Sequence, residues 1–479
     1  MVSKHRIRNP FQKGRAALFT SLLTCATLLL AGGLFATGGD GEFHSSIPNL
    51  KPFHDPSGEL STFTTQGSID TNNPFFQDLG TNGRRCVTCH QASDAWTVTP
   101  PHIRERFEDT DGTDPIFRTN DGSTCPSNDV STLEARRKAY SLLLNKGLIR
   151  IELSVPAGAE FTVANNDNPY GCTSLDDISV YRRPLPSTNL GFLSTVMWDG
   201  RETFKNPDGT FKSITFDLSD QAVGATLGHA QAVHAPTPDQ VHQIVDFETA
   251  LFTAQFRDNE AGLLDAHGAR GGPVALSQQP FFIGINDPLG LNPTGAPFSS
   301  TIFTLFEKWL TIPDSEYNER TEARRSIARG EQLFNTLPIP ITGVGGLNDA
   351  LKVPVIHGFC GTCHDTPNAG DHSVSAPLNI GISDASRRTP DLPLITLRNI
   401  KTGELIQTMD PGRALISGKW ADIGKTKGPI LRGLAGRAPY FHNGSAATLG
   451  DVVDFYVTRF NLNLSERDKD DLVAFLKTL

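Results

Sequence analysis

The chain has 479 residues and contains little methionine, little cysteine and no excess of positive charge. Its formal net charge of −9 argues against nucleic-acid binding, because nucleic-acid-binding proteins neutralise phosphates with lysine and arginine. Three methionines leave few thioether groups to serve as metal ligands. After residue 36, no stretch is long and apolar enough to cross a membrane. The composition, 38% hydrophobic with 29 phenylalanines, is that of a folded chain with room for two or three domains.

The amino-terminal segment differs from the rest of the chain. Five lysines and arginines, without an acidic residue, precede an apolar run from Ala16 to Ala36. This order is typical of a secretory signal, so we expect residues 1–36 to be a signal peptide, cleaved near Ala36, or alternatively an uncleaved membrane anchor. Cleavage would remove five positive charges and change the net charge from −9 to −14. We therefore expect a periplasmic or otherwise exported protein, attached to a membrane only if the segment is uncleaved.

Six cysteines follow the signal segment, and four of them fall in two short motifs. The other two, Cys125 and Cys172, lie in loops rich in glycine, proline and serine. Because an exported compartment permits oxidation, we expect these two residues to form a disulfide; two unpaired thiols are the alternative.

The motif Cys-x-x-Cys-His occurs twice, in RRCVTCHQ (84–91) and in FCGTCHD (359–365). This motif attaches a c-type haem: its cysteines form thioether bonds to the two vinyl groups, and its histidine lies beneath the ring as a ligand of the iron. The sequence therefore predicts two covalently bound haem c groups. The predicted residues are Cys86, Cys89 and His90 for the first haem, and Cys360, Cys363 and His364 for the second.

A zinc site, a redox-active dithiol or a chance match could also account for these motifs. A zinc site pairs one Cys-x-x-Cys with another and needs no adjoining histidine. A thioredoxin-like dithiol belongs to a strand–helix pattern that this sequence lacks. Two haem motifs in one exported chain favour haem over all three.

The pattern of helix signals predicts a mainly α fold with long loops and a few short strands, organised as two cytochrome c-like haem domains. We expect residues 37–275 to form the amino-terminal domain and residues 276–479 the carboxy-terminal domain, joined across a Gly-, Pro- and Asn-rich stretch at 268–299. Apolar periodicity and capping residues predict a β-hairpin at 394–408 and helices at 132–149, 237–252, 300–310, 322–334, 449–456 and 465–479.

Three segments resemble the bacterial diheme cytochrome c peroxidase superfamily, which includes the MauG proteins. The family's Arg-x-x-Pro…Asn…Phe-Trp-Asp-Gly-Arg segment is similar to YRRPLPSTNLGFLSTVMWDGRE (181–202), and its Ala-Pro-Tyr-Phe-His-Asp-Gly block to KGPILRGLAGRAPYFHNGSAATLGDVVDFY (427–456). The family's final helix is similar to LVAFLKTL (472–479). The resemblance covers most of residues 70–479, with insertions near 105–180 and 203–217. It implies a peroxidatic haem in the amino-terminal domain and an electron-transfer haem in the carboxy-terminal domain.

The resemblance implies three catalytic residues at the first haem. Trp198 matches the tryptophan that lies between the two haems of the family and can pass electrons; a buried core tryptophan is the alternative. Gln221 matches the glutamine of the family's peroxide pocket. The family's acidic residue ten positions later is replaced by Gln231. His229 could take over its proton transfer, or could be an ordinary histidine.

The resemblance also suggests a ligand for the second haem. Tyr456 stands where the peroxidases carry a ligating methionine and MauG a ligating tyrosine, so we expect Tyr456 to bind the iron; Met409, no ligand and a plain core tyrosine are the alternatives. His442 could also approach this haem, or form hydrogen bonds within the turn of its own motif. His102, twelve residues after His90, is an outside candidate for a displaceable ligand of the first haem, which we expect to be five-coordinate.

Together these features predict an exported diheme oxidoreductase that reduces hydrogen peroxide at the first haem with electrons relayed through the second. The electrons would come from a small electron-donor protein or from an organic or protein substrate. Two alternatives remain open: an oxygen-dependent diheme oxygenase that acts on an organic substrate, and a non-catalytic electron-transfer protein with both irons fully ligated.

Overall fold

A computed structural model describes residues 46–280, 288–290 and 297–479, and residues 44–479 form one compact unit. The predicted signal segment lies outside the described residues. The predicted domain boundary between residues 275 and 276 stays a prediction. In the part of the chain that the structure describes, no helix combines the length with the apolar composition that crossing a bilayer requires.

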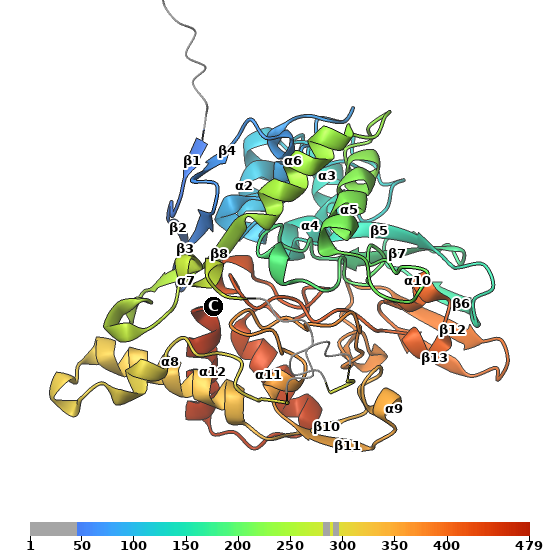
Figure 1. The fold of residues 1–479 in the computed structure, drawn as a ribbon. Helices are drawn as coiled ribbons and strands as arrows, with labels where there is room; N and C mark the ends of the chain where they lie inside the picture. Colours follow the sequence, from blue (N-terminus) through green and yellow to red (C-terminus); the bar gives the residue numbers. More distant parts are fainter. Residues whose placement is uncertain (1–45, 281–287, 291–296) are drawn as a thin grey trace, which may run out of the picture. The chain divides into compact units, whose positions relative to one another are not determined.

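The helices are distributed along the whole described chain (Figure 1). Their bounds are α1 (Cys86–Cys89), α2 (Pro100–Thr110), α3 (Leu133–Ala139), α4 (Ser141–Lys146), α5 (Ile214–Gly228), α6 (Pro238–Thr249), α7 (Pro273–Ser277), α8 (Glu319–Thr336), α9 (Asn348–Leu351), α10 (Ala414–Ser417), α11 (Leu449–Phe460) and α12 (Glu466–Lys477).

The strands form small antiparallel sheets with the orders β1-β4, β2-β3-β8-β9, β5-β7, β13-β12-β6 and β10-β11. Their bounds are β1 (Ser46–Pro48), β2 (Phe53–Asp55), β3 (Gly58–Thr64), β4 (Ser68–Asp70), β5 (Ile149–Ser154), β6 (Phe161–Asp167), β7 (Asp177–Arg182), β8 (Leu251–Asp258), β9 (Gly262–Leu263), β10 (Ile339–Thr342), β11 (Val355–Gly358), β12 (Leu394–Asn399) and β13 (Leu405–Thr408).

The fold contains more strand than the mainly α prediction allowed. Of the described residues, 34% are helical and 18% lie in strands or bridges, so the chain is mixed. Much of the unpredicted strand lies in the insertion near 105–180, where β5, β6 and β7 form. At the start of β6, Phe161 and Val163 are buried and Thr162 between them is exposed, which is the period of a half-buried strand. The same insertion carries the expected disulfide, which is confirmed: Cys125 and Cys172 are bonded, with their Cα atoms 5.7 Å apart.

Helix caps were well marked in the sequence, and the structure confirms them. Thr237 Oγ1 accepts a hydrogen bond from the N–H of Gln240, whose side chain accepts one from the N–H of Thr237, at the start of α6. Ser465 and Asp468 cap α12 in the same reciprocal way. The helix predicted at 132–149 is wrong at Tyr140, where it is interrupted, and over its last three residues. It divides into α3 and α4, and Gly147, with φ of 61°, ends α4 before β5 begins at Ile149.

The helix predicted at 300–310 is wrong as well, because only a short 3₁₀ helix forms there, at Glu307–Thr311. Two side chains of α8, Asn335 and Glu331, accept hydrogen bonds from backbone N–H groups of this segment and hold it in a non-helical conformation. The donors are Ile302, Phe303, Leu305 and Phe306. The apolar pattern that suggested a helix still marks a core, since all but Leu310 of its apolar residues are buried.

The second motif is supported by the packing of α8 against α12. A Cβ atom on Gly330 would lie 1.9 Å from the carbonyl oxygen of Asp471, so only glycine permits this approach. Phe334 of α8 then contacts both Phe475 of α12 and the imidazole of His364, with ring centroids 5.7 and 6.2 Å away. Helices α8 and α12 therefore form an apolar surface against which the second motif packs.

The predicted hairpin at 394–408 is confirmed as β12 and β13. The sheet has a third strand that the sequence did not predict. β6, from the insertion in the first half of the chain, pairs with β12 from Leu394 opposite Asp167 to Asn399 opposite Phe161. Two segments more than 200 positions apart thus share one sheet.

Candidate functional site

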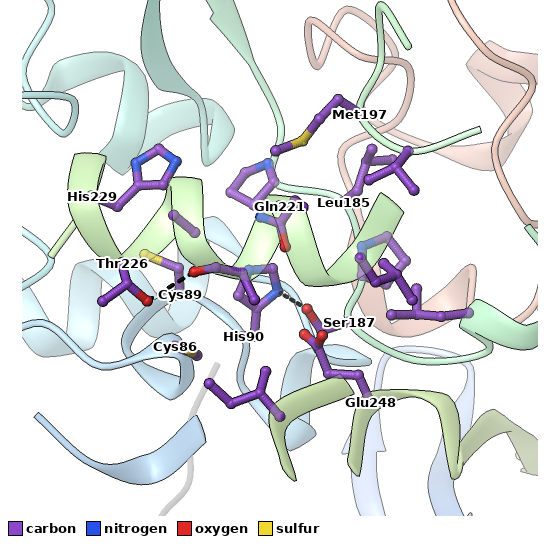
Figure 2. Close-up of a pocket in the computed structure, with 18 of the residues that line it drawn as sticks. Cys86, Cys89, His90, Leu185, Ser187, Met197, Gln221, Thr226, His229 and Glu248 are labelled. Atoms are coloured by element: carbon purple, nitrogen blue, oxygen red, sulfur yellow. Dashed lines mark hydrogen bonds between the residues drawn. The ribbon is translucent and has the colours of Figure 1, made fainter. Parts of the chain in front are cut away.

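Each Cys-x-x-Cys-His motif lies in the wall of its own cavity. The first cavity lies between α1, which carries Cys86 and Cys89, and α5, which carries Gln221 (Figure 2). The second contains Cys360, Cys363 and His364 together with apolar side chains of α8, α11 and α12. Most of the residues that line either cavity are apolar, so a ligand held there would be largely shielded from water.

The imidazole of His90 is fixed through its Nδ1 atom. Nδ1 lies 2.9 Å from the carbonyl oxygen of Trp96 and 3.0 Å from Oγ of Ser187. Because a carbonyl only accepts, Nδ1 carries the proton and Nε2 keeps its lone pair. Burial lowers the pKa of His90 to about 4, which keeps the ring neutral near pH 7. A neutral imidazole with a bonded Nδ1–H is the usual form of a metal-ligating histidine.

A buried carboxyl group lies behind His90. Glu248, from α6, lines the first cavity beside Ser187, which hydrogen-bonds it (Figure 2). Burial raises the pKa of Glu248 to about 7. Its charge near neutral pH therefore depends on the pH, and Ser187 links that charge to the imidazole of His90.

The second cavity repeats the arrangement around His364. Nδ1 of His364 lies 2.6 Å from the carbonyl oxygen of Gly370, and burial lowers the pKa of His364 to about 4. Tyr456, from α11, lines this cavity. Burial and the neighbouring cysteines raise the pKa of Tyr456 above its ordinary value. Met409 packs instead with Leu142, Leu148, Tyr181 and Leu392. Of the two candidate ligands, the structure brings Tyr456 and not Met409 to the cavity.

One wall is common to both cavities. The residues that line both are Arg183, Pro184, Leu185, Pro186, Trp198 and Lys427. Nε1 of Trp198 donates a hydrogen bond to the carbonyl oxygen of Arg183 at 2.8 Å, and Nζ of Lys427 donates one to that of Thr195 at 2.7 Å. The structure thus places Trp198 between the two motifs, and its role in electron transfer stays a prediction.

The cysteines of the two cavities do not suit a redox dithiol or a zinc site. Burial raises the pKa of Cys86 and of Cys360 to about 12, whereas a reactive dithiol needs a lowered thiol pKa. The two motifs line separate cavities with a wall between them, so their cysteines cannot meet in one four-ligand zinc site.

Buried positive charges around the cavities suit a haem. Burial lowers the pKa of Arg183 and of Arg437 to about 10, and that of Lys427 to about 8, with Asp371 offsetting part of the lysine charge. Within the described part of the chain, Nε of Arg437 has no hydrogen-bond partner. Buried cations are stable only when an anion compensates them, and the two propionate groups of a haem are such anions. The residues present therefore fit the group that the motifs predict.

Two of the predicted peroxide-pocket residues reach the first cavity. Gln221 lines it from α5, and His229, the residue after the end of α5, lines it as well. Nδ1 of His229 contacts the carboxylate of Asp121. Gln231, which replaces the family's acidic residue, is exposed and accepts a hydrogen bond from Asn82 at 3.2 Å; it is not among the described residues that line the cavity.

The other two candidate histidines have different positions. His102, on α2, contacts Asp94 through Nδ1 and belongs to neither set of cavity-lining residues in the described chain, so the structure gives it no access to the first motif. His442 lines the second cavity, and its Nε2 lies 3.1 Å from Oγ of Ser383. Burial lowers the pKa of His442 to about 4, and its Nδ1 has no hydrogen-bond partner among the described residues.

Sequence reasoning missed three polar residues of these cavities: Asp121, Glu248 and Lys427. Asp121 lies in the insertion near 105–180, where no motif marks it, and its partner is 108 positions away. Glu248 lies within a helix that the sequence predicted but has no distinguishing neighbour. Lys427 opens the segment 427–456 that resembles the peroxidase family, and its position there was the one available signal.

Comparisons with known proteins agree on one class of relative. No family model matches the chain. Cytochrome-c peroxidase IdrP2 of Denitromonas iodatirespirans is 37% identical over 145 residues, which are 27% of this chain and 38% of the relative. Cytochrome c peroxidase Ccp of Escherichia coli (strain K12) is 31% identical over 180 residues, 36% of this chain and 30% of the relative. Cytochrome c551 peroxidase of Nitrosomonas europaea is 44% identical over 78 residues, 15% of this chain and 23% of the relative.

These matches are partial, since each spans less than two fifths of the relative's length. Among solved structures, the crystal structure of a MauG-like protein associated with microbial copper homeostasis aligns with 85% of this chain and 86% of that chain. The sequence identity is 16% and the TM-score is 0.35, a level that establishes neither a shared fold nor a shared function.

Proposed function

We propose that this chain is a diheme c-type oxidoreductase of the cytochrome c peroxidase and MauG-like family and that it reduces hydrogen peroxide, as its partial similarity to cytochrome c peroxidases suggests. Two covalently bound haem c groups would be held by the two Cys-x-x-Cys-His motifs. Electrons would reach the first haem through the second, from a small electron-donor protein or from an organic or protein substrate. The proposal depends above all on the two apolar cavities, each with a complete motif, that share a wall containing Trp198.

The side chains of the cavities support a division of labour between them. A bound haem supplies the iron at which peroxide binds and through which electrons pass. In the first cavity, the Gln221 amide can donate a hydrogen bond to a peroxide oxygen, and His229 can move a proton. In the second cavity, Tyr456 would bind iron as a phenolate. Its raised pKa is compatible with that role because binding to a metal displaces the proton.

Export of the protein is part of the proposal. The bond between Cys125 and Cys172 supports an oxidising compartment such as the periplasm, because disulfides rarely persist in a reducing cytosol. The predicted cleavage of residues 1–36 would deliver the chain there.

The test begins with the haem content of the purified holoprotein. We expect two haems per chain that stay attached in acidified acetone, and a high-spin ferric band that shifts within milliseconds of mixing with hydrogen peroxide. A reduced small cytochrome should then be oxidised at two molecules per peroxide. Two low-spin haems whose spectra do not change with peroxide would indicate a non-catalytic electron-transfer protein. Stoichiometric oxygen uptake without peroxide would indicate an oxygenase.

A further inference from the structure

We propose that Asp121 and His229 form a dyad that transfers protons in the first cavity, with His229 as the acid–base group and Asp121 as its positioning residue. The inference rests on the proposed function for its substrate, hydrogen peroxide. It deepens that function with a residue from the insertion near 105–180, where the resemblance to the peroxidase family is interrupted.

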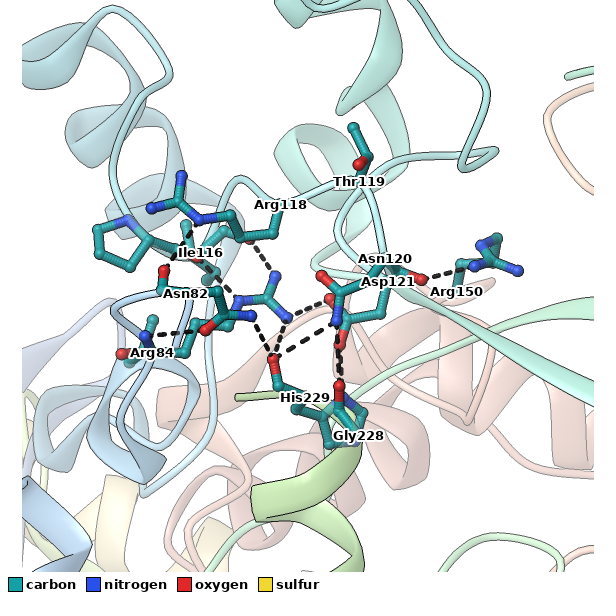
Figure 3. A network of polar contacts seen from close by, with 12 residues as sticks. Asn82, Arg84, Ile116, Arg118, Thr119, Asn120, Asp121, Arg150, Gly228 and His229 are labelled. Atoms are coloured by element: carbon teal, nitrogen blue, oxygen red, sulfur yellow. Dashed lines mark hydrogen bonds and ion pairs between the residues drawn. The ribbon is translucent and has the colours of Figure 1, made fainter. Parts of the chain in front are cut away.

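Asp121 determines which nitrogen of His229 can react. Its Oδ2 accepts a hydrogen bond from Nδ1 of His229 (Figure 3). With the proton on Nδ1, the lone pair is on Nε2. Both residues line the first cavity together with His90. Nε2 is therefore the nitrogen that exchanges a proton with a molecule bound in this cavity.

Arg84 holds Asp121 in place and keeps it ionised. Nη1 of Arg84 contacts Oδ1 of Asp121, while Nη2 donates to the carbonyl oxygen of Ile116 at 2.7 Å and Nε to that of Pro115 at 2.8 Å (Figure 3). Burial alone would raise the pKa of Asp121, but the hydrogen bond and charge of His229 and the charge of Arg84 lower it below its ordinary value. A carboxylate that accepts from Nδ1 fixes the tautomer and the orientation of the imidazole.

The backbone of His229 is fixed as firmly as its ring. Its carbonyl oxygen accepts hydrogen bonds from Nδ2 of Asn82 at 2.8 Å, Nη1 of Arg84 at 3.3 Å and Nδ2 of Asn120 at 3.4 Å. Its N–H donates to the carbonyl oxygen of Ala225 in the last turn of α5 at 2.8 Å. The acid–base group is thus oriented before any substrate arrives, which lowers the cost of reorganisation during the reaction.

The reaction has a defined place for this group. Reduction of hydrogen peroxide to two water molecules breaks the O–O bond and consumes two electrons and two protons. Nε2 of His229 would take the proton from one peroxide oxygen and give it to the other oxygen, which leaves as water. The electron donor of the proposed function supplies the two electrons through the haem groups, and solvent supplies two protons that convert the remaining oxygen to the second water molecule.

The molecule contains a matched control for the dyad. His102 and Asp94 make the same contact, from Nδ1 to a buried carboxylate, but neither residue is among the described residues that line the first cavity. Removing the imidazole of His102 therefore removes a histidine–aspartate pair without changing the site.

The test compares the association of cyanide and of azide with the ferric holoprotein, followed by stopped-flow absorbance. At neutral pH cyanide is present as a weak acid and must lose its proton to bind iron, whereas azide is already an anion. We expect His229→Gln to slow cyanide association about 100-fold and Asp121→Asn about tenfold, with azide changed by less than about threefold. The double variant should be no slower than His229→Gln, because Asp121 acts through His229. His102→Gln should change the association rate of neither cyanide nor azide.

Equal slowing of cyanide and azide, or unchanged cyanide association in both variants, would overturn the dyad. Peroxide reduction by the wild type serves as the separate readout of the proposed function. A wild type that ignores peroxide but takes up cyanide through the dyad contradicts the proposed function and supports the dyad. If the wild type reduces peroxide and both variants reduce it equally fast, the proposed function is supported and the dyad is contradicted. A wild type that binds neither anion overturns both.

Discussion

The indole of Trp198 and the imidazole of His442 are in contact, with ring centroids 5.9 Å apart and planes inclined by 58°. Trp198 lies in the wall that both cavities share, whereas His442 lines the second cavity. The two rings therefore form an aromatic link from the shared wall into the second cavity.

We expect Trp198→Phe to slow electron transfer between the haems about tenfold, a change of about 1.4 kcal/mol in the barrier, because phenylalanine is harder to oxidise and lacks the bond to Arg183. The measurement is the rate at which the first haem is re-reduced after a single peroxide turnover. Trp420→Phe is the control, since Trp420 is not among the described residues that line either cavity. Equal rates in the wild type and in Trp198→Phe would remove Trp198 from the electron path.

Tyr456→Phe should change the spectrum of the second haem and leave that of the first unchanged, because only the second cavity contains this phenol among the described residues. We also expect the second haem's reduction potential to rise, since loss of a phenolate removes negative charge that stabilises the oxidised iron. Electron paramagnetic resonance and a redox titration measure both effects. Tyr140→Phe, in another core cluster, is the control, and unchanged spectra in Tyr456→Phe would show that Tyr456 is not a ligand.

Glu248→Gln should remove a pH dependence from the first haem. The pKa of Glu248 is about 7, so raising the pH through 7 adds a negative charge beside Ser187 and His90 and stabilises oxidised iron. We expect the midpoint potential to fall with rising pH in this window, by at most about 59 mV per pH unit. Glu248→Gln should give a flat profile there, and a slope that survives the substitution would assign the effect to another group.

A buried ion-pair network near the second cavity should dominate the acid stability. Arg182 is fully buried and donates to Asp410 at 2.7 and 2.9 Å, and to Asp199. Arg182→Met would leave the buried Asp410 without its arginine and Asp199 with Arg201 alone, and we expect a loss of about 3–5 kcal/mol in the free energy of unfolding, measured by urea denaturation. Arg388→Met removes a half-exposed ion pair with Asp167 and should cost less than about 1 kcal/mol. A similar small loss in both variants would contradict this expectation.

The same network sets a direction for the pH dependence of stability. Burial alone would raise the pKa of Asp410, but Arg182 and His442 lower it to about 2. A carboxyl with a lowered pKa in the folded state stabilises the fold above its unfolded pKa of about 3.9, and this stability is lost as the pH falls through the folded value. Urea midpoints should therefore decrease between about pH 4 and pH 2, and the decrease should be smaller in Asp410→Asn.

Local patterns predicted local structure well in this chain. The capping residues Thr237 and Ser465 marked real helix starts, and the resemblance to the peroxidase family agrees with partial relatives that are cytochrome c peroxidases. Prediction from sequence fails where the structure of one segment depends on contacts with a distant segment. The segment at 300–310 has a helical apolar pattern, but Glu331 and Asn335 of α8 take its backbone donors. No window of sequence contains both partners.

The contact between Asp121 and His229 in the candidate site could not be predicted for the same reason. His229 could be proposed from its distance to Gln221 in the sequence, but the carboxylate that orients it lies 108 positions earlier, in an insertion without a motif. Spacing alone predicts the residues proposed to hold a haem, because the motif contains all three within five positions. It could not predict that Asp121 contacts His229, because the fold brings the two together from separate segments.

The pairing of β6 with β12 limits how this protein can be divided or recombined. A polypeptide that ends near residue 275 would expose β6, and its counterpart would expose β12, as open strand edges that recruit other chains into aggregates. Chimaeras that exchange one half with a relative would meet the same obstacle unless they carry the insertion and the hairpin together. Each half therefore depends on the other to complete this sheet, even though each has its own haem motif.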